Sequence, residues 1–204
     1  MFTYAQMMKL FENIKREVLN TLNESKPSKT NKGYRGQILE LLLGLKLSSA
    51  LTDLIDGELK TFTIGESIAI SSLKHFLNEI VSGVKFEDST LYQKMIRTIY
   101  VGFQKKTGLY QGYKGVDLTE DPELFNKIKE DYEFICEEIR RRIRDGVQLK
   151  TINGPNMILQ IRTKASKNSD GTYTPLKFNG AVIKDKYMAF FVRASYGKGL
   201  NLIK

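Results

Sequence analysis

The long helical pattern near the middle of the chain is the feature that most restricts its fold. Between Asp121 and Gly146, apolar side chains recur at helical spacing: Phe125, Ile128, Tyr132, Ile135, Ile139 and Ile143. Asp121 followed by Pro122 is typical of a helix start, and Gly146 is typical of a helix end. The fold must therefore bury one apolar stripe of a long helix against other elements.

Patterns on both sides of this helix predict further helices and strands. Apolar side chains in 4–22 lie near one helical face, Val18 among them. Segments 97–104 and 109–116 are rich in Ile, Tyr, Val and Phe, and the link 105–108 between them favours a hairpin. The other expected elements are helices over 33–47 and 71–80, strands over 58–62, 67–70 and 157–161, and strand and loop beyond 161. We expect 67–70 to be the antiparallel neighbour of 58–62, in an α/β or α+β fold around a central sheet.

The net charge favours a negatively charged partner. Lysine and arginine number 32 against 23 aspartates and glutamates, which gives a formal charge of +9. Such a surplus favours a polyanion, because released counterions drive the association. Lysine-rich chains are common, however, so charge alone does not select nucleic acid over other partners.

Several functional classes are disfavoured by residues that are scarce. His75 is the one histidine, which disfavours zinc ligation and a serine–histidine mechanism. Cys136 is the one cysteine, so no internal disulfide can form and a reducing compartment is expected. The longest apolar stretch, 38–47, is too short and too polar for a membrane span, and the N-terminus lacks a signal-peptide pattern. We expect a soluble cytoplasmic protein with no membrane partner.

Two carboxylates and a lysine stand close together at Asp53, Glu58 and Lys60. Metal-dependent phosphodiester cleavage needs carboxylates to hold a divalent cation and a lysine to orient or deprotonate the attacking water. If this segment is extended, Glu58 and Lys60 share one face while Leu59 points into the core. The alternative is a solvated strand face with an ion pair, since the same acid–x–lysine triplet recurs in the loop-like segment 24–26.

Glu40 is a third acidic candidate, and it lies in the apolar run 38–43. A carboxylate in a buried helix is costly unless it is paired or bound to a metal, so Glu40 could belong to the same site. It could equally lie on the one polar stripe of that helix, in a row with small residues. Both interpretations stay open at this point.

Beyond these residues, the chain resembles the MutH mismatch-repair nuclease and its relatives, among them restriction endonucleases that cut at GATC. The likeness begins with Lys32 to Glu40, followed by Asp53 and the triplet 58–60. It continues in order at Phe86–Ser89 with Lys94–Arg97, at Lys129–Tyr132, at Leu159–Ala165 and faintly at Ala189–Arg193. These anchors span about residues 32 to 200.

This resemblance implies a branch of the PD-(D/E)xK nucleases, with a restriction-endonuclease-like central mixed sheet flanked by helices and two lobes around a DNA-binding cleft. By that likeness Asp53 and Glu58 would ligate Mg²⁺, with Mn²⁺ able to substitute, and Glu40 would bind the metal directly or through water. Lys60 would assist the nucleophilic water, and Lys94 would support the site near the phosphate.

The resemblance also implies a set of residues that contact DNA. Lys164, beside Arg162, would match the lysine that helps to read the recognition site in the major groove, where such donors suit guanine acceptors. The further expected contacts are Lys32, Arg35, Lys167, Phe191 and Arg193.

Two departures from MutH are informative. The interval from Asp53 to Glu58 is two residues shorter, which requires a tighter turn between the metal ligands. Phe191 stands where MutH has a tyrosine implicated in sensing adenine methylation, and a phenyl ring cannot donate that hydrogen bond. The second departure weakens the expectation of discrimination at hemimethylated sites.

The sequence therefore predicts a type II restriction-like, Mg²⁺-dependent endonuclease that acts on double-stranded DNA at a short site, with GATC as the first candidate. One alternative is a MutH-like nicking enzyme with a MutL-like activator, and another is a catalytically silent DNA-binding module of the same fold. A homodimer on DNA would allow a double-strand cut. We expect one endonuclease domain over 1–204, with an N-terminal helix over 1–22, a catalytic lobe over about 32–120 and a DNA-reading lobe over about 121–204.

Overall fold

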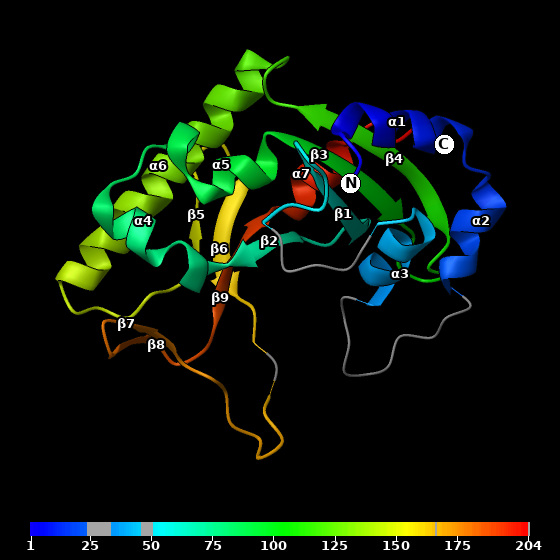
Figure 1. Cartoon of the computed structure of the whole chain (residues 1–204). Coiled ribbons are helices and arrows are strands. Elements are labelled where there is room, and N and C mark those ends of the chain that lie inside the picture. Colours follow the sequence, from blue (N-terminus) through cyan, green and yellow to red (C-terminus); the bar gives the residue numbers. More distant parts are fainter. Residues whose placement is uncertain (24–33, 46–50, 166, 204) are drawn as a thin grey trace. The chain divides into compact units, whose positions relative to one another are not determined.

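Helices and strands occur in both of the units into which the chain divides (Figure 1). The computed structural model describes residues 1–23, 34–45, 51–165 and 167–203. The first unit comprises Met1–Ile68, Gln93–Glu120 and Gly197–Lys204, and the second comprises Ala69–Tyr92 and Asp121–Tyr196. The expected mixed α/β class is thus confirmed. Each unit is built from segments that are distant in sequence.

A three-stranded sheet forms the centre of the first unit, in the order β1-β3-β4. Its strands are β1 (Glu58–Thr63), β3 (Arg97–Phe103) and β4 (Tyr110–Asp117). The pair β3 and β4 is antiparallel, and Gln104 N–H donates to the Leu109 carbonyl at 2.8 Å beyond its end. The hairpin predicted from the sequence is therefore confirmed.

The predicted partner of β1 was wrong. Strand β1 pairs with β3 in parallel, with Glu58 opposite Thr98, and not with the segment that follows it in the chain. Ile64 N–H still donates to the Phe103 carbonyl at 2.9 Å, so the chain leaves β1 alongside β3. It then enters β2 (Ile68–Ser72), which belongs to a different sheet. A parallel pair requires such a long crossover before the chain returns to its neighbour.

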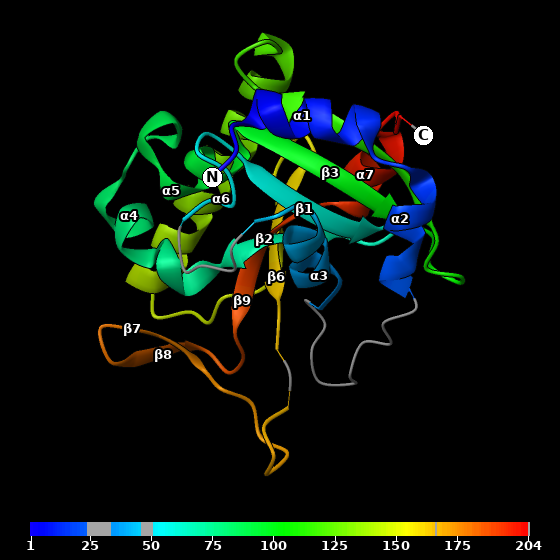
Figure 2. The same ribbon diagram turned by 45° about the vertical axis from the view of Figure 1, so that its right-hand side comes forward.

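Three α-helices of the first unit pack around this sheet: α1 (Tyr4–Asn13), α2 (Arg16–Asn20) and α3 (Tyr34–Leu42). Figure 2 shows α1 lying across β3, and α1, α2 and α3 contact β3, β4 and β1 respectively. The expectation of one helix over 4–22 was wrong, because Ile14 adopts an extended backbone conformation that ends α1. This break turns Leu19 into the core and leaves Val18 exposed.

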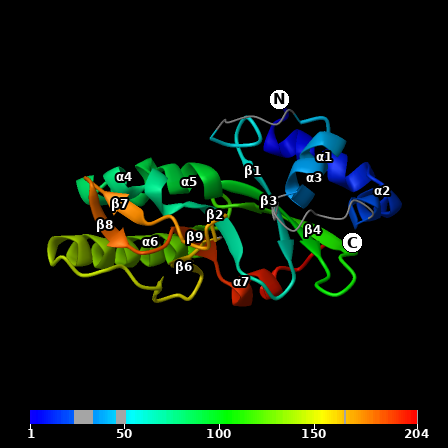
Figure 3. The same cartoon turned by 90° about the horizontal axis from the view of Figure 1, so that it is seen from below.

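The predicted long helix is confirmed as α6 (Pro122–Arg144) of the second unit, beside α4 (Leu77–Ser82) in Figure 3. Asp121 caps it by accepting a hydrogen bond from Leu124 N–H at 2.9 Å, and proline occupies the first turn. Its buried stripe includes Ile128, Tyr132, Ile135 and Ile139. Cys136 is buried on the same helix, and burial raises the pKa of its thiol to about 12.

A second sheet has the order β2-β9-β6-β5, and β7 and β8 form a small separate pair. The remaining elements are η1 (Thr21–Asn23), η2 (Leu73–His75), η3 (Phe86–Asp88), α5 (Thr90–Met95), β5 (Ile152–Asn153), β6 (Leu159–Thr163), β7 (Leu176–Phe178), β8 (Ala181–Lys184), β9 (Met188–Val192) and α7 (Ala194–Gly199). The last of these is a helix that the sequence did not predict.

A buried carboxylate joins α6 to the entry of β6. Asp131 is fully buried, and its side chain accepts hydrogen bonds from the N–H groups of Asn156, Ile158 and Leu159 at 2.6, 2.8 and 2.8 Å. Gly154 lies so close that an added Cβ would stand 2.1 Å from the Asp131 Cγ. Three charge-assisted hydrogen bonds thus fix the backbone just before the strand that carries Arg162.

Candidate active site

Strand β1 presents Glu58 and Lys60 on one face, as the alternation of the strand predicted. Lys60 Nζ forms an ion pair with Glu58 Oε1, while Leu59 between them is buried in the core. Glu58 is only 2% exposed, whereas Lys60 is 22% exposed. A carboxylate buried to this degree needs compensation for its lost hydration, and the neighbouring amine supplies it.

Asp53 is bonded to the start of the same strand. Its backbone N–H donates to Glu58 Oε2 at 3.3 Å, and its Oδ2 accepts from Leu59 N–H at 3.1 Å. The turn between them is closed by Leu54 N–H, which donates to the Gly57 carbonyl at 3.0 Å. These bonds bring the two predicted metal ligands together.

Lys94 reaches the same carboxylate from α5. Its Nζ lies 3.5 Å from Glu58 Oε1 and also donates to the carbonyl of Leu51. Its side chain is 13% exposed, so the amine is largely shielded from solvent. Glu58 therefore has two amine partners, Lys60 and Lys94. The sequence predicted Lys94 only as support near the phosphate, not as a partner of Glu58.

Glu40 is coupled to this cluster through charge. Helix α3 packs on β1, where an added Cβ at Gly36 would stand 3.5 Å from Thr61 Oγ1. Burial raises the pKa of the Glu40 carboxyl, the charge of Asp53 raises it further, Lys60 opposes this and Glu58 adds to it. Glu40 thus lies within electrostatic range of the site.

The environment of Glu40 is less apolar than the sequence predicted. Leu39 and Leu43 are buried, but Leu41 and Leu42 are 52% and 39% exposed. The helix therefore buries one stripe only. Apolar residues on consecutive positions cannot all face one sheet, so only part of the apolar run is buried.

The donor set of the cluster suits a hard divalent cation, because carboxylate oxygens are the ligands that Mg²⁺ prefers. Burial is the largest cause of the raised pKa of Glu40, and repulsion by Asp53 and Glu58 adds to it; a cation would relieve that repulsion. Within the described residues, however, no three acidic, histidine or cysteine side chains are already arranged to hold a metal ion. Metal binding would require these carboxylates to draw closer and the pair between Glu58 and Lys60 to open.

The predicted DNA contacts of the second unit lie on and beyond β6 and β9. Arg162 is exposed, and its guanidinium carbon stands 5.3 Å from the centre of the Phe191 ring. Lys164, just beyond the end of β6, is also exposed. Lys167 is exposed, and Arg193 is half-buried with its Nη1 3.3 Å from Met157 Sδ.

The two N-terminal candidates for DNA contact differ in what the structure says of them. Arg35 is partly buried on α3, with its guanidinium carbon 4.7 Å from the centre of the Phe103 ring, and burial lowers its pKa. This stacking directs Arg35 toward the sheet of its own unit. Lys32 lies outside the described residues.

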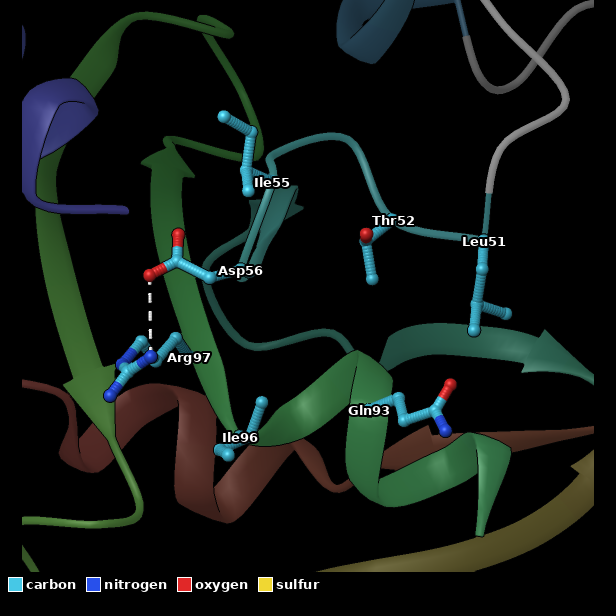
Figure 4. A pocket seen from close by; sticks show the side chains of 8 residues that line it. Leu51, Thr52, Ile55, Asp56, Gln93, Ile96 and Arg97 are labelled. Carbon is cyan, nitrogen blue, oxygen red and sulfur yellow. Dashed lines mark hydrogen bonds and ion pairs between the residues drawn. The ribbon is translucent and has the colours of Figure 1, made fainter. Parts of the chain in front are cut away.

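Two residues that the sequence analysis did not select hold the turn that carries Asp53. Asp56 Oδ2 lies 3.2 Å from Arg97 Nη1, and Arg97 Nε donates to Asp117 Oδ2 at 2.7 Å. Figure 4 shows Asp56 and Arg97 paired at a pocket of about 290 Å³, whose walls also include Leu51, Ile55, Gln93 and Ile96. The sequence offered two signals for these residues. Asp56 lies between the predicted ligands Asp53 and Glu58, and Arg97 ends the segment 94–97 that resembles MutH.

No protein-family model matches this chain, and no curated protein matches its sequence. Across the described residues, no helix is both long and apolar enough to cross a membrane.

Proposed function

We propose that this protein is a Mg²⁺-dependent endonuclease that hydrolyses phosphodiester bonds of double-stranded DNA at a short specific site, GATC being the first candidate. One observation carries the proposal: Asp53, Glu58, Lys60 and Lys94 converge at the start of one strand, with Glu40 in electrostatic range. Two or three carboxylates beside a lysine are the groups that this hydrolysis requires.

The proposal gives each of these residues a role. Asp53, Glu58 and Glu40 would hold the cation, for which Mn²⁺ would substitute. When bound, Mg²⁺ would neutralise charge on the scissile phosphate and lower the pKa of the attacking water. Lys60 would orient that water or take its proton, and Lys94 would lie near the phosphate.

The ion pair between Lys60 and Glu58 suits a reversible role for the lysine. A cation held by Glu58 would compete with Lys60, whose amine is paired with that carboxylate. Loading the site would therefore free the Lys60 amine for the water, while Lys94 stays held by the Leu51 carbonyl. The lysine is thus paired with Glu58 before the metal arrives.

DNA binding is supported by charge and exposure. The surplus of +9 favours a polyanion, and Arg162, Lys164 and Lys167 are exposed cations. Arg193 and Arg35 would add contacts to DNA, each beside the unit to which it belongs. The proposal carries with it the restriction-endonuclease-like fold and DNA-binding cleft that the resemblance to MutH implies.

A restriction role is preferred to mismatch repair because Phe191 lacks the hydroxyl of the tyrosine found in MutH. One site per chain cuts one strand, so a double-strand cut needs a second copy on the DNA or two successive nicks. A repair role would instead require a MutL-like activator.

The test is plasmid cleavage. Unmethylated, hemimethylated and fully adenine-methylated plasmids are incubated with the protein in Mg²⁺, and binding is measured in Ca²⁺. Double-strand cuts at unmethylated sites support restriction, whereas activator-dependent nicks at hemimethylated sites support repair. A mobility shift without any cleavage in Mg²⁺ would identify a catalytically silent DNA-binding module and would overturn the proposed endonuclease activity.

A matched pair of variants tests the site itself. Asp53→Ala should abolish cleavage and leave DNA binding in Ca²⁺ largely intact. Glu66→Ala is the control, because Glu66 is an exposed acid of the same unit that pairs with Lys105 at 3.1 Å. Wild-type turnover by Asp53→Ala removes Asp53 from the site.

A further inference from the structure

The turn between Asp53 and Glu58 is tied to the N-terminal segment of its own unit. Ile55 N–H donates to the Phe2 carbonyl at 2.9 Å, and Tyr4 N–H donates to Asp56 Oδ1 at 2.6 Å. Both bonds join residues more than 50 positions apart, so they are tertiary contacts. They fasten the middle of the turn, not its ends.

The second carboxylate oxygen of Asp56 links the turn to the sheet through Arg97. Oδ2 accepts from Arg97 Nη1 at 3.2 Å, and Arg97 Nε donates to Asp117 Oδ2 at 2.7 Å (Figure 4). Asp117 also accepts from Thr119 N–H and Oγ1 at 2.9 and 2.7 Å. Arg97 opens β3 and Asp117 closes β4, so the chain of bonds runs from the turn across two paired strands.

Gly57 brings the turn against the backbone of β3. A Cβ at this position would stand 2.7 Å from the Arg97 carbonyl oxygen. The residue that pairs with Asp56 therefore also touches the next residue of the turn. Arg97 constrains the turn through its side chain and its backbone at once.

We infer that Asp56 and Arg97 are positioning residues that keep the turn closed, so that Asp53 and Glu58 face each other, and that they thereby set the affinity of the cluster for a divalent cation. This rests on the proposed function in its metal-binding part. Neither residue touches the cation or the DNA phosphate in this assignment; each acts through the turn. Groups that hydrogen-bond to metal ligands commonly change metal affinity by about 10- to 100-fold when they are lost, and Asp56 and Arg97, which act one step further out, should change it less.

The experiment measures Mn²⁺ and Ca²⁺ binding by calorimetry on the full chain without DNA, together with amide hydrogen exchange at Ile55 and Leu59. Arg97→Gln should weaken cation binding by up to about tenfold and speed exchange at both amides. Arg97→Lys should recover part of the affinity. Lys105→Gln, the loss of an exposed cation paired with Glu66, should change neither quantity.

Asp56→Asn keeps the test decisive if Arg97→Gln fails to fold. Its amide oxygen can still accept from Tyr4 N–H, while the charge that attracts Arg97 is gone, so a weaker loss of cation affinity is expected. Unchanged affinity in a folded variant, with wild type binding the cation, overturns the inference alone. A wild-type protein that binds neither cation overturns the proposed function, and the affinity part of the inference with it.

Discussion

Lys60 forms its ion pair with Glu58, the carboxylate two residues before it on the same face of β1. Lys94 lies 3.5 Å from the same oxygen, so one nearly buried carboxylate has two amine partners. Loss of either amine leaves the other to compensate the charge of Glu58. Effects of these lysines on catalysis can therefore be separated from effects on folding.

Lys60→Met should lower the single-turnover cleavage rate by at least about 100-fold, because the water loses its general base or orienting group. Binding of the DNA in Ca²⁺ should change little. Lys105→Met, at the exposed ion pair with Glu66, is the matched control and should cut at the wild-type rate. A rate for Lys60→Met within twofold of wild type would exclude the lysine from the reaction.

Glu40→Gln should stabilise the fold at neutral pH while it impairs cleavage. The folded-state pKa of Glu40 is raised, so ionisation of this carboxyl opposes folding as the pH rises through that value. The gain should be below about 1 kcal/mol, since the side chain is partly exposed and screened, and it should vanish at about pH 4. Urea unfolding at the two pH values measures it, and lower stability of Glu40→Gln at pH 7 would contradict the assignment.

Divalent cations should raise the thermal midpoint of the wild-type protein. A ligand that binds only the folded state stabilises it by about 2.7 kcal/mol at 100 times its dissociation constant. Differential scanning fluorimetry with Ca²⁺ should show this shift, and Asp53→Asn should lose it. Sodium chloride at equal ionic strength controls for screening; an equal shift with that salt would argue against a specific site.

Phe191→Leu should weaken binding of the cognate duplex by about two- to fivefold, because a cation–π contact made by an exposed cation such as Arg162 contributes about 0.5–1 kcal/mol. The ring lies against Arg162, which the proposal places at the bases. Phe191→Tyr keeps the ring and is the control. Fluorescence anisotropy in Ca²⁺ provides the affinities, and equal loss on a scrambled duplex would mean that the ring does not serve site recognition.

Gly154→Ala should destabilise the fold by about 1–3 kcal/mol, as overpacking of a buried position does. The added methyl would collide with Asp131, whose carboxylate accepts three backbone hydrogen bonds. Gly199→Ala, where no neighbouring atom lies within 4 Å of the new Cβ, should be almost neutral. Chemical denaturation compares the stability of the two variants. Equal stability would mean that the backbone around Gly154 moves away from Asp131 at little cost.

Local patterns predicted the elements that local physics decides. The cap at Asp121, the stripe through Ile135 and the hairpin before Leu109 each follow from neighbouring residues, and each is confirmed. The closeness of Asp53, Glu58 and Lys60 was equally readable, because five positions and a strand alternation limit their separation.

Contacts between segments that are distant in sequence could not be predicted from such local patterns. The parallel pairing of Glu58 with Thr98 depends on which distant strand offers an open edge, and nothing in the adjacent segment encodes it. The break at Ile14 exists because Leu19 must reach a core that forms from other segments. The Asp56–Arg97 pair joins positions 41 residues apart, so only the folded chain brings them together.

The burial of Cys136 also has a practical consequence. Its thiol is the single sulfhydryl of the sequence and has a pKa of about 12, so the reactive thiolate is scarce at neutral pH. A cysteine introduced on the surface, at Lys105 for example, would then be the one fast-reacting position for maleimide dyes. Site-selective fluorescent labelling can thus proceed without first replacing the natural residue.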